Sequence, residues 1–246
     1  MIPSITTSLS SANTVEEEFP RPFWEKALDY TIAIVSLLTL LPVALIAIAV
    51  IKCGSPGPTV FKQRRIGHRG QPFMIYKLRT MRLGAETESH ERHTLKLMRS
   101  NLPLRKMDSE GDSRLVPFGR FLRSSGIDEL PQLINVLKGE MSIVGPRPCV
   151  PSESAAFSPT DRKRFNTLPG ITGLWQVSGK NSLTFAEMID CDIQYTLRKN
   201  LGMYLRIVAK TPTVLIKQIL DTKSASAIAK MPSGDQMVED DRKIAS

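Results

Sequence analysis

The chain has 246 residues, of which 41% are hydrophobic and 23% are charged, and its formal net charge is +9. These proportions are those of a folded protein and exclude a chain that is disordered throughout. The positive charge favours an acidic partner, which could be nucleic acid, an anionic membrane surface or a polyphosphate substrate.

The first two predicted elements are a disordered tail at residues 1–20, rich in Ser, Thr and Glu, and a membrane helix at residues 21–53. Every residue from Thr31 to Ile51 is uncharged, and this run matches the thickness of a bilayer core. Pro42 removes a backbone hydrogen bond in the middle of the run and predicts a bend. The segment could therefore cross the bilayer as a kinked helix, or enter and leave by the same face. A core helix of a soluble protein is the alternative, although such helices usually carry a polar stripe.

The next segment is basic and predicts a β-hairpin. Eight lysines and arginines, and no acidic residue, lie from Lys52 to Arg82. The positive-inside rule places this flank in the cytoplasm, close to anionic headgroups. Residues 60–64 and 73–77 predict two short strands around a turn at residues 67–70.

The remaining pattern predicts an α+β fold that is mostly helical, with a catalytic domain at residues 54–221 and a flexible C-terminal tail at residues 222–246. Several of the helices are amphipathic and are expected at the membrane interface. His90 and His93 have no evident third ligand, so a solvated helix face is the expectation for them. The predicted helices cover residues 85–100, 115–124, 130–138, 152–166, 184–200 and 202–221.

Asp128 and Glu129 form a carboxylate pair directly before a predicted helix that has Pro131 in its first turn. A helix N-terminus stabilises a carboxylate and attracts phosphate, although a pair of this kind is on its own more simply explained as a helix cap. Arg123 precedes the pair, and Arg147, between two prolines, is suited to binding phosphate. Two acids, fixed arginines and no Ser–His pairing favour phosphoryl chemistry with a divalent cation, most simply Mg²⁺.

Ordered motifs along the chain carry a resemblance to a known family. They are the apolar run with its internal proline and the segments Phe61–Gly67, Lys77–Met81, Asp128–Gln132, Gly139–Pro148 and Pro169–Gly173. With these motifs the chain resembles the bacterial sugar transferases, the small monotopic polyprenyl-phosphate phosphoglycosyl transferases. The resemblance extends from about residue 23 to residue 217.

The resemblance implies that the Asp matching Asp128 attacks the β-phosphate of a UDP-sugar, releases UMP and holds the phosphosugar covalently until undecaprenyl phosphate accepts it. It also implies that the Glu matching Glu129 binds Mg²⁺ and that arginines matching Arg123 and Arg147 contact phosphate. Arg79, within the Lys-Leu-Arg motif, is added as a third candidate for phosphate binding. The apolar segment would be a re-entrant helix, broken at Pro42, with both ends in the cytoplasm.

The implied setting is the bacterial inner membrane, with the catalytic domain facing the cytoplasm, at the first membrane step of exopolysaccharide, capsule or other glycan assembly. The expected partners are the two substrates and membrane lipids, with a homodimer left open. No motif identifies the sugar. The chain departs from the common pattern at Leu41, where the family often has Ser, and at Tyr204, where many members have Asp.

Two other classes of protein fit the sequence less well. A membrane-tethered nucleic-acid-binding protein would interleave its basic residues with aromatic ones, whereas aromatic residues make up only 6% of this chain. Nucleic acid is therefore not an expected partner. A scaffold without catalytic activity is disfavoured because Asp128, Glu129 and Arg147 are all present.

Overall fold

The computed structural model describes residues 21–82, 94–98, 100, 102–104 and 114–228. Within these residues the fold is mostly helical, as predicted, with one long N-terminal helix and two small sheets. In chain order the elements are α1 (Phe23–Gly54), β1 (Val60–Ile66), η1 (His68–Gly70), β2 (Pro72–Leu78), α3 (Gly119–Ser125), η3 (Ile127–Glu129), α4 (Gln132–Leu137), β3 (Ser142–Val144), α5 (Pro151–Ala155), η4 (Asp161–Asn166), β4 (Gly170–Thr172), α6 (Leu174–Val177), η5 (Lys180–Ser182), α7 (Phe185–Arg198) and α8 (Leu201–Ile228).

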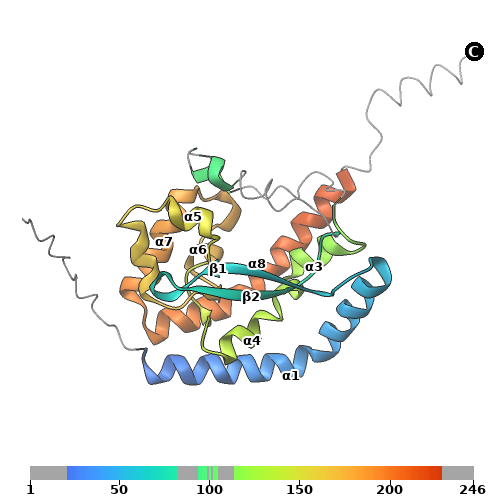
Figure 1. Ribbon diagram of the computed structural model, residues 1–246, viewed down its shortest axis with the longest axis horizontal. Helices are drawn as coiled ribbons and strands as arrows, with labels where there is room; N and C mark the ends of the chain where they lie inside the picture. The colour runs from blue at the N-terminus through green and yellow to red at the C-terminus, as the bar shows by residue number, and fades with distance from the viewer. Residues whose placement is uncertain (1–20, 83–93, 99, 101, 105–113, 229–246) are drawn as a thin grey trace, which may run out of the picture.

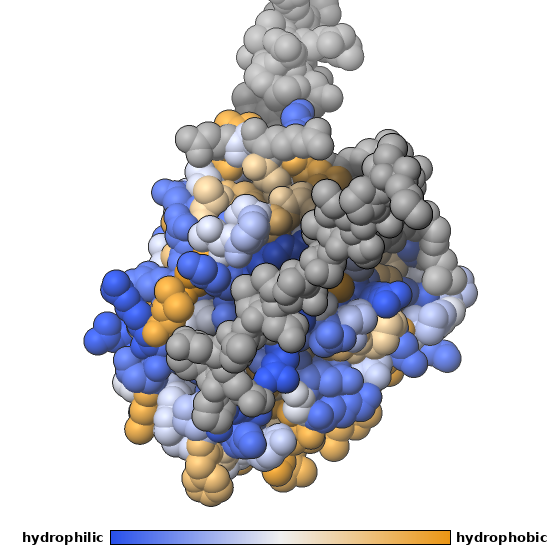
Figure 2. Space-filling view, turned by 60° about the vertical axis from the view of Figure 1, so that its left-hand side comes forward, coloured by the Kyte–Doolittle hydropathy of each residue, from blue (hydrophilic) through white to orange (hydrophobic). Residues whose placement is uncertain are grey.

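Helix α1 is continuous through Pro42, runs beneath the rest of the molecule and bends upward in its second half (Figure 1). Only 11% of its most apolar 18-residue window is buried inside the protein, so it is not the core helix of a soluble domain. Its exposed apolar residues include Ile34, Val35, Leu38, Leu41, Leu45 and Ile46. Figure 2 shows hydrophobic residues along the lower edge of the molecule, where α1 lies. This surface indicates association with a membrane.

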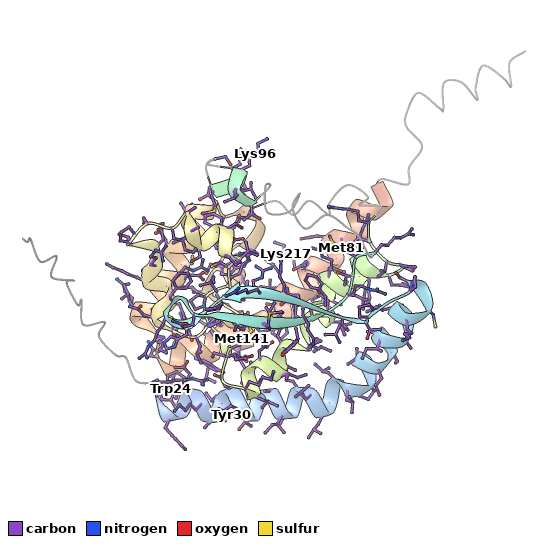
Figure 3. The ribbon with its side chains drawn as sticks, viewed as in Figure 1. Trp24, Tyr30, Met81, Lys96, Met141 and Lys217 are labelled. Atoms are coloured by element: carbon purple, nitrogen blue, oxygen red, sulfur yellow. The ribbon has the colours of Figure 1, made fainter. Side chains whose placement is uncertain are left out.

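The N-terminal end of α1 is fixed to the domain by a buried polar network. The Oδ1 atom of Asp29 accepts hydrogen bonds from Tyr204 Oη (2.6 Å), Ser142 Oγ (3.0 Å) and the Ile143 amide (2.8 Å). The other carboxylate oxygen of Asp29 pairs with Arg21. A buried carboxylate in an apolar helix requires such partners, and they hold this end of α1 against β3 and α8. Trp24, labelled in Figure 3, packs its ring edge-on against that of Tyr204.

The C-terminal end of α1 is fixed to the same domain by different contacts. Ala47 and Ile51 are buried with Leu78 of β2 and Leu122 of α3. The segment directly after the helix is bound by the side chain of Arg79, described below. Both ends of α1 therefore contact one domain, while its middle presents apolar side chains to the surroundings.

Strands β1 and β2 form the predicted antiparallel hairpin, with Gln63 opposite Ile75 and Arg65 opposite Phe73. The connection between them contains Arg69 at φ 55° and Gly70 at φ 69°. Side chains alternate between the two faces of a strand. Gln63, Arg65 and Lys77 consequently share the face that also carries the buried Ile75, whereas Lys62 and Arg64 lie on the exposed face.

The helices agree with the prediction to different degrees. The helix predicted at residues 184–200 is confirmed as α7, which begins with a capping box between Thr184 and Glu187. The single helix predicted at residues 152–166 is wrong, because α5 and η4 are separate short elements with Pro159 between them. Helix α8 extends past its predicted end at residue 221 to Ile228. His90 and His93 lie outside the described residues.

The main core lies where α1, β2, α4, β3, α7 and α8 meet. It is built from Ile75, Leu133, Val136, Met141, Val144, Tyr195, Tyr204 and Ile207, among others. A second cluster packs α6 and α7 against η4 and the segment after β3, with Cys149, Phe157, Phe165, Trp175, Phe185, Met188 and Ile189. The hairpin face that carries Arg65 and Lys77 also carries Phe73 and Ile75, which pack in the main core.

Candidate functional site

Asp128 and Glu129 lie in the 3₁₀ turn η3 between α3 and α4. Gly126, at φ 73°, ends α3 in the left-handed conformation that suits glycine and turns the chain into η3. Asp128 is 8% exposed, whereas the side chain of Glu129 is one-third exposed at 33%. One acid of the pair is therefore shielded from water and the other is partly open to it.

The pair lies just before α4, as predicted, but the predicted position of Pro131 in the first turn of that helix is wrong. Helix α4 starts at Gln132, and Pro131 occupies its N-cap position instead of its first turn. The residue at the N-cap of η3 is Gly126. Neither carboxylate stands at an N-cap, so helix capping does not explain the pair.

Lys77 of β2 is a hairpin residue that contacts the carboxylate pair. Its Nζ atom donates a hydrogen bond to Glu129 Oε1 at 2.8 Å. Both side chains are about 30% exposed, so solvent screens the ion pair and its energy is modest. The contact fixes where Glu129 lies relative to the hairpin.

Arg65 lies further along the same hairpin face. Its Nε and Nη2 atoms donate to Gln63 Oε1 at 3.1 and 2.7 Å, and its Nη1 atom donates to the carbonyl oxygen of Pro148 at 3.2 Å. The amide of Ile66 donates to the carbonyl oxygen of Cys149 at 2.8 Å. Strand β1 therefore holds the segment that contains Arg147 through both its backbone and its side chains.

Arg147 lies in the loop after β3, and its guanidinium faces Glu153 of α5. The Arg147 Nη1 atom donates to Glu153 Oε2 at 2.9 Å, and Nη2 lies 3.5 Å from Glu153 Oε1. The carbonyl oxygen of Arg147 accepts a hydrogen bond of 2.7 Å from Arg164, which also pairs with Asp192 of α7. Glu153, Arg164 and Asp192 are all buried, so buried charged groups hold the loop in place.

Two glycines let the backbone of the Arg147 loop lie close to the backbone of residues 168–170. A Cβ atom on Gly145 would lie 2.3 Å from the carbonyl oxygen of Leu168, and one on Gly170 would lie 2.0 Å from the amide nitrogen of Gly145. Only glycine permits this backbone contact. The contact explains why the motifs Gly139–Pro148 and Pro169–Gly173 contain these glycines.

The charges around Arg147 act on one another. Burial, and after it the positive charge of Arg147, lowers the pKa of Arg65 to about 10. Burial raises the pKa of the Glu153 carboxyl, but the charge and hydrogen bond of Arg147 outweigh burial, so the net pKa lies below its ordinary value. Burial raises the pKa of the Cys149 thiol to about 11, which makes it a neutral, unreactive group.

The other predicted phosphate-binding residues are Arg123 and Arg79. Arg123 lies in the last turn of α3, five residues before Asp128, and its carbonyl oxygen accepts a hydrogen bond from Gln218 of α8. The two terminal nitrogens of Arg79 donate to the carbonyl oxygens of Pro56 and Ser55 at 2.6 and 2.7 Å. The Arg79 guanidinium thus binds the backbone that follows α1. Its contact with phosphate stays a prediction.

Asp128 and Glu129 suit the Mg²⁺ ion that the sequence predicts. Among the described residues no group of three His, Cys, Asp or Glu side chains could hold a metal. Mg²⁺ does not need such a group, because it is bound by one or two carboxylates together with substrate phosphates and water.

An apolar helix fixed at both ends, a carboxylate pair and several buried guanidinium groups define a membrane-associated domain suited to phosphate chemistry. The family model for bacterial sugar transferases matches residues 21–218. The chain therefore belongs to the bacterial sugar transferase family, as the resemblance implied, and it is an enzyme of the transferase class.

Three characterised or named relatives illustrate the match. The chain is 35% identical over 233 residues to the exopolysaccharide production protein ExoY of Rhizobium meliloti, covering 87% of this chain and 98% of that protein. It is 37% identical over 200 residues to a UDP-glucose:undecaprenyl-phosphate glucose-1-phosphate transferase of Caulobacter vibrioides, covering 78% and 69%. It is also 37% identical over 193 residues to the galactosyl transferase CpsE of Streptococcus agalactiae, but the match spans only 42% of that longer protein.

Proposed function

We propose that this chain transfers a sugar 1-phosphate from a UDP-sugar to undecaprenyl phosphate and releases UMP. The reaction would be the first membrane step in the assembly of an exopolysaccharide, capsule or other glycan. The named activity of the Caulobacter relative supports the substrate classes. The sugar itself is not specified by any feature of this chain.

The observation that carries the proposal is the unequal exposure of the carboxylate pair. Asp128 is shielded from water, while its neighbour Glu129 is partly exposed and paired with Lys77. A shielded carboxylate is poorly solvated and attacks phosphorus more readily than a hydrated one, once a substrate excludes the remaining water. Glu129 is the better placed of the two to meet a hydrated ion.

In the first step an oxygen of Asp128 attacks the β-phosphorus of the UDP-sugar. The bond from this phosphorus to the bridging oxygen breaks, and UMP leaves with the electron pair. The phosphosugar is then held on Asp128 as an acyl phosphate. In the second step an oxygen of undecaprenyl phosphate attacks the same phosphorus, which restores the carboxylate and forms the undecaprenyl diphosphate sugar.

The charge of the diphosphate has to be neutralised while its bridge breaks. Glu129, with Asp128 beside it, would hold Mg²⁺, which supplies this neutralisation when bound. The guanidinium groups of Arg123 and Arg147 would bind phosphate oxygens and orient the donor. Arg147 suits this role because Glu153 and Arg164 hold it from two sides.

The attachment of α1 supports a re-entrant helix in place of a membrane span. Its two ends pack on one domain through Asp29 and Ile51, and its exposed apolar residues lie between them. A lipid-bound acceptor would reach the carboxylate pair from that membrane surface. The domain would face the cytoplasm, where nucleotide sugars are found, at the inner membrane.

The test is UMP release by the full chain in nanodiscs with Mg²⁺, undecaprenyl phosphate and a panel of UDP-sugars. Asp128→Asn should reduce the rate by at least about a thousandfold, since it removes the nucleophile. Without the acceptor, intact-mass analysis should find the wild type heavier by one phosphosugar, with the adduct on Asp128. Asp190→Asn, which changes an exposed acid on α7, is the matched control and should keep full activity.

A lack of UMP release with every UDP-sugar would overturn the proposed function and favour the scaffold alternative. Full activity in Asp128→Asn would instead overturn the assignment of the nucleophile. Loss of activity with EDTA, together with a raised Mg²⁺ requirement in Glu129→Gln, is expected from the metal role of Glu129.

A further inference from the structure

Buried charges around the Arg147 loop do not balance. Arg164 pairs with Asp192, and Arg147 pairs with Glu153. Within the described residues, every hydrogen bond of the Arg65 guanidinium goes to a neutral oxygen, from Gln63 or from the Pro148 carbonyl. Among these described residues, three guanidinium groups and two carboxylates therefore leave Arg65 without a carboxylate in hydrogen-bond contact.

An uncompensated buried charge is costly and calls for an anion. The residue that carries it, Arg65, is only 8% exposed. The cluster is nevertheless not sealed, because about a quarter of the Arg147 side chain (26%) is exposed beside it. An anion that approaches Arg147 from solvent can therefore reach the cluster.

Arg65 lies on the same hairpin as Lys77, the residue that contacts the carboxylate pair. Lys77, which holds Glu129, and Arg65 share one face of the hairpin and lie four residue pairs apart in its register. The Arg65 guanidinium contacts the Arg147 loop at the Pro148 carbonyl oxygen, and the charge of Glu129 also acts on its pKa. The nucleotide portion of a donor whose β-phosphate lies at Asp128 could extend along this face.

We propose that Arg65 and Arg147 form one phosphate-binding subsite, which holds the phosphate of the UMP portion of the donor. Gln63 orients the guanidinium group of Arg65 by accepting two of its hydrogen bonds. An anion between the two guanidinium groups supplies the missing counter-charge and relieves their mutual repulsion. The identity of the anion as a nucleotide phosphate rests on the proposed function, but the charge imbalance does not.

The test is binding of UMP and of uridine to the full chain in nanodiscs, measured by calorimetry without acceptor lipid. Arg65→Gln should weaken UMP binding at least about tenfold, because a charge-assisted contact to phosphate is lost. Uridine has no phosphate, so its affinity should not change. Arg64→Gln removes the same charge from the exposed face of the same strand, and we expect it to change UMP affinity less than about twofold.

Equal UMP affinities in Arg65→Gln and Arg64→Gln would overturn the subsite. If Arg65→Gln does not fold, Gln63→Leu decides, because it removes the oxygen that accepts two hydrogen bonds from the Arg65 guanidinium. An anion subsite predicts weaker UMP binding in Gln63→Leu, whereas unchanged binding contradicts it. These outcomes are separate from failure of the proposed function, which would appear as wild-type protein that releases no UMP from any UDP-sugar.

Discussion

The Nζ atom of Lys77 lies 2.8 Å from Oε1 of Glu129, the residue proposed to bind Mg²⁺. An ammonium group and a metal ion compete for the same carboxylate, since each is attracted by its negative charge. Lys77→Met should therefore tighten metal binding about two- to fivefold, the range that a partly exposed ion pair permits. Electron paramagnetic resonance of Mn²⁺ added to substrate-free protein measures this affinity directly.

The control for this prediction is Lys163→Met, which removes an exposed lysine in η4. It should leave Mn²⁺ affinity unchanged apart from the small effect of net charge. Weaker Mn²⁺ binding in Lys77→Met would show that Lys77 positions Glu129 for the metal and does not compete with it.

Arg79 binds the end of α1 through the carbonyl oxygens of Ser55 and Pro56. Arg79→Met should lower the free energy of unfolding by about 2 kcal/mol, because two hydrogen bonds from a charged donor are lost. Thermal unfolding in detergent measures the loss, and hydrogen exchange should rise at residues 51–58. Arg82→Met, which changes an exposed arginine, is the control. Unchanged stability with lost UDP-sugar binding would favour the original prediction of a phosphate contact.

Glu153 gives the stability of the fold a defined pH dependence. Its net pKa lies below the ordinary value of about 4.3, since Arg147 outweighs the effect of burial. A carboxyl with a lowered pKa in the folded state stabilises the fold above its unfolded pKa and loses this effect as pH falls through the folded pKa. Glu153→Gln should thus cost about 1–2 kcal/mol at pH 7 and progressively less below about pH 4.

Chemical unfolding in detergent between pH 7 and pH 3 measures this difference. Asp190→Asn serves as the reference for removal of an exposed carboxylate, and its effect should vary little with pH. A cost of Glu153→Gln that is constant down to pH 3 would mean that the ion pair with Arg147 does not contribute.

Features that depend on residues close together in the sequence were predictable from the sequence alone. The hairpin follows from two strand patterns around a Gly-rich turn, and α7 begins at a Thr and Glu with capping-box spacing. The long apolar run identified α1 in the same way. The helix predicted at residues 152–166 was wrong because Pro159 interrupts a regular helix within that range.

The charged partners in the site were not predictable in this way. Arg79 binds carbonyl groups more than 20 residues earlier, and Arg164 pairs with Asp192, 28 residues later. No local pattern encodes such pairs, because they depend on how elements pack. A weaker signal for Arg65 was present: strand alternation separates it from Arg64 and groups it with Gln63.

The attachment of α1 predicts that its two ends lie on one side of the membrane. Asp29 and Ile51 are buried against a single domain, and a bilayer core about 30 Å thick would separate the ends of a spanning helix. The exposed Cys53 is a native labelling site at one end, and Phe23→Cys places a second at the other, where the side chain is 85% exposed. Cys149 is buried and should not react.

A membrane-impermeant maleimide, applied separately to intact spheroplasts and to inverted membrane vesicles, measures the accessibility of each site. Both cysteines should react in inverted vesicles and neither in intact spheroplasts, with Cys191→Ser used to remove the remaining partly exposed thiol. Reaction of Cys53 and of the cysteine at position 23 from opposite sides would require the helix to span the bilayer. The domain would then have to release one end of α1, and either the network around Asp29 or the packing of Ile51 would be broken in the membrane.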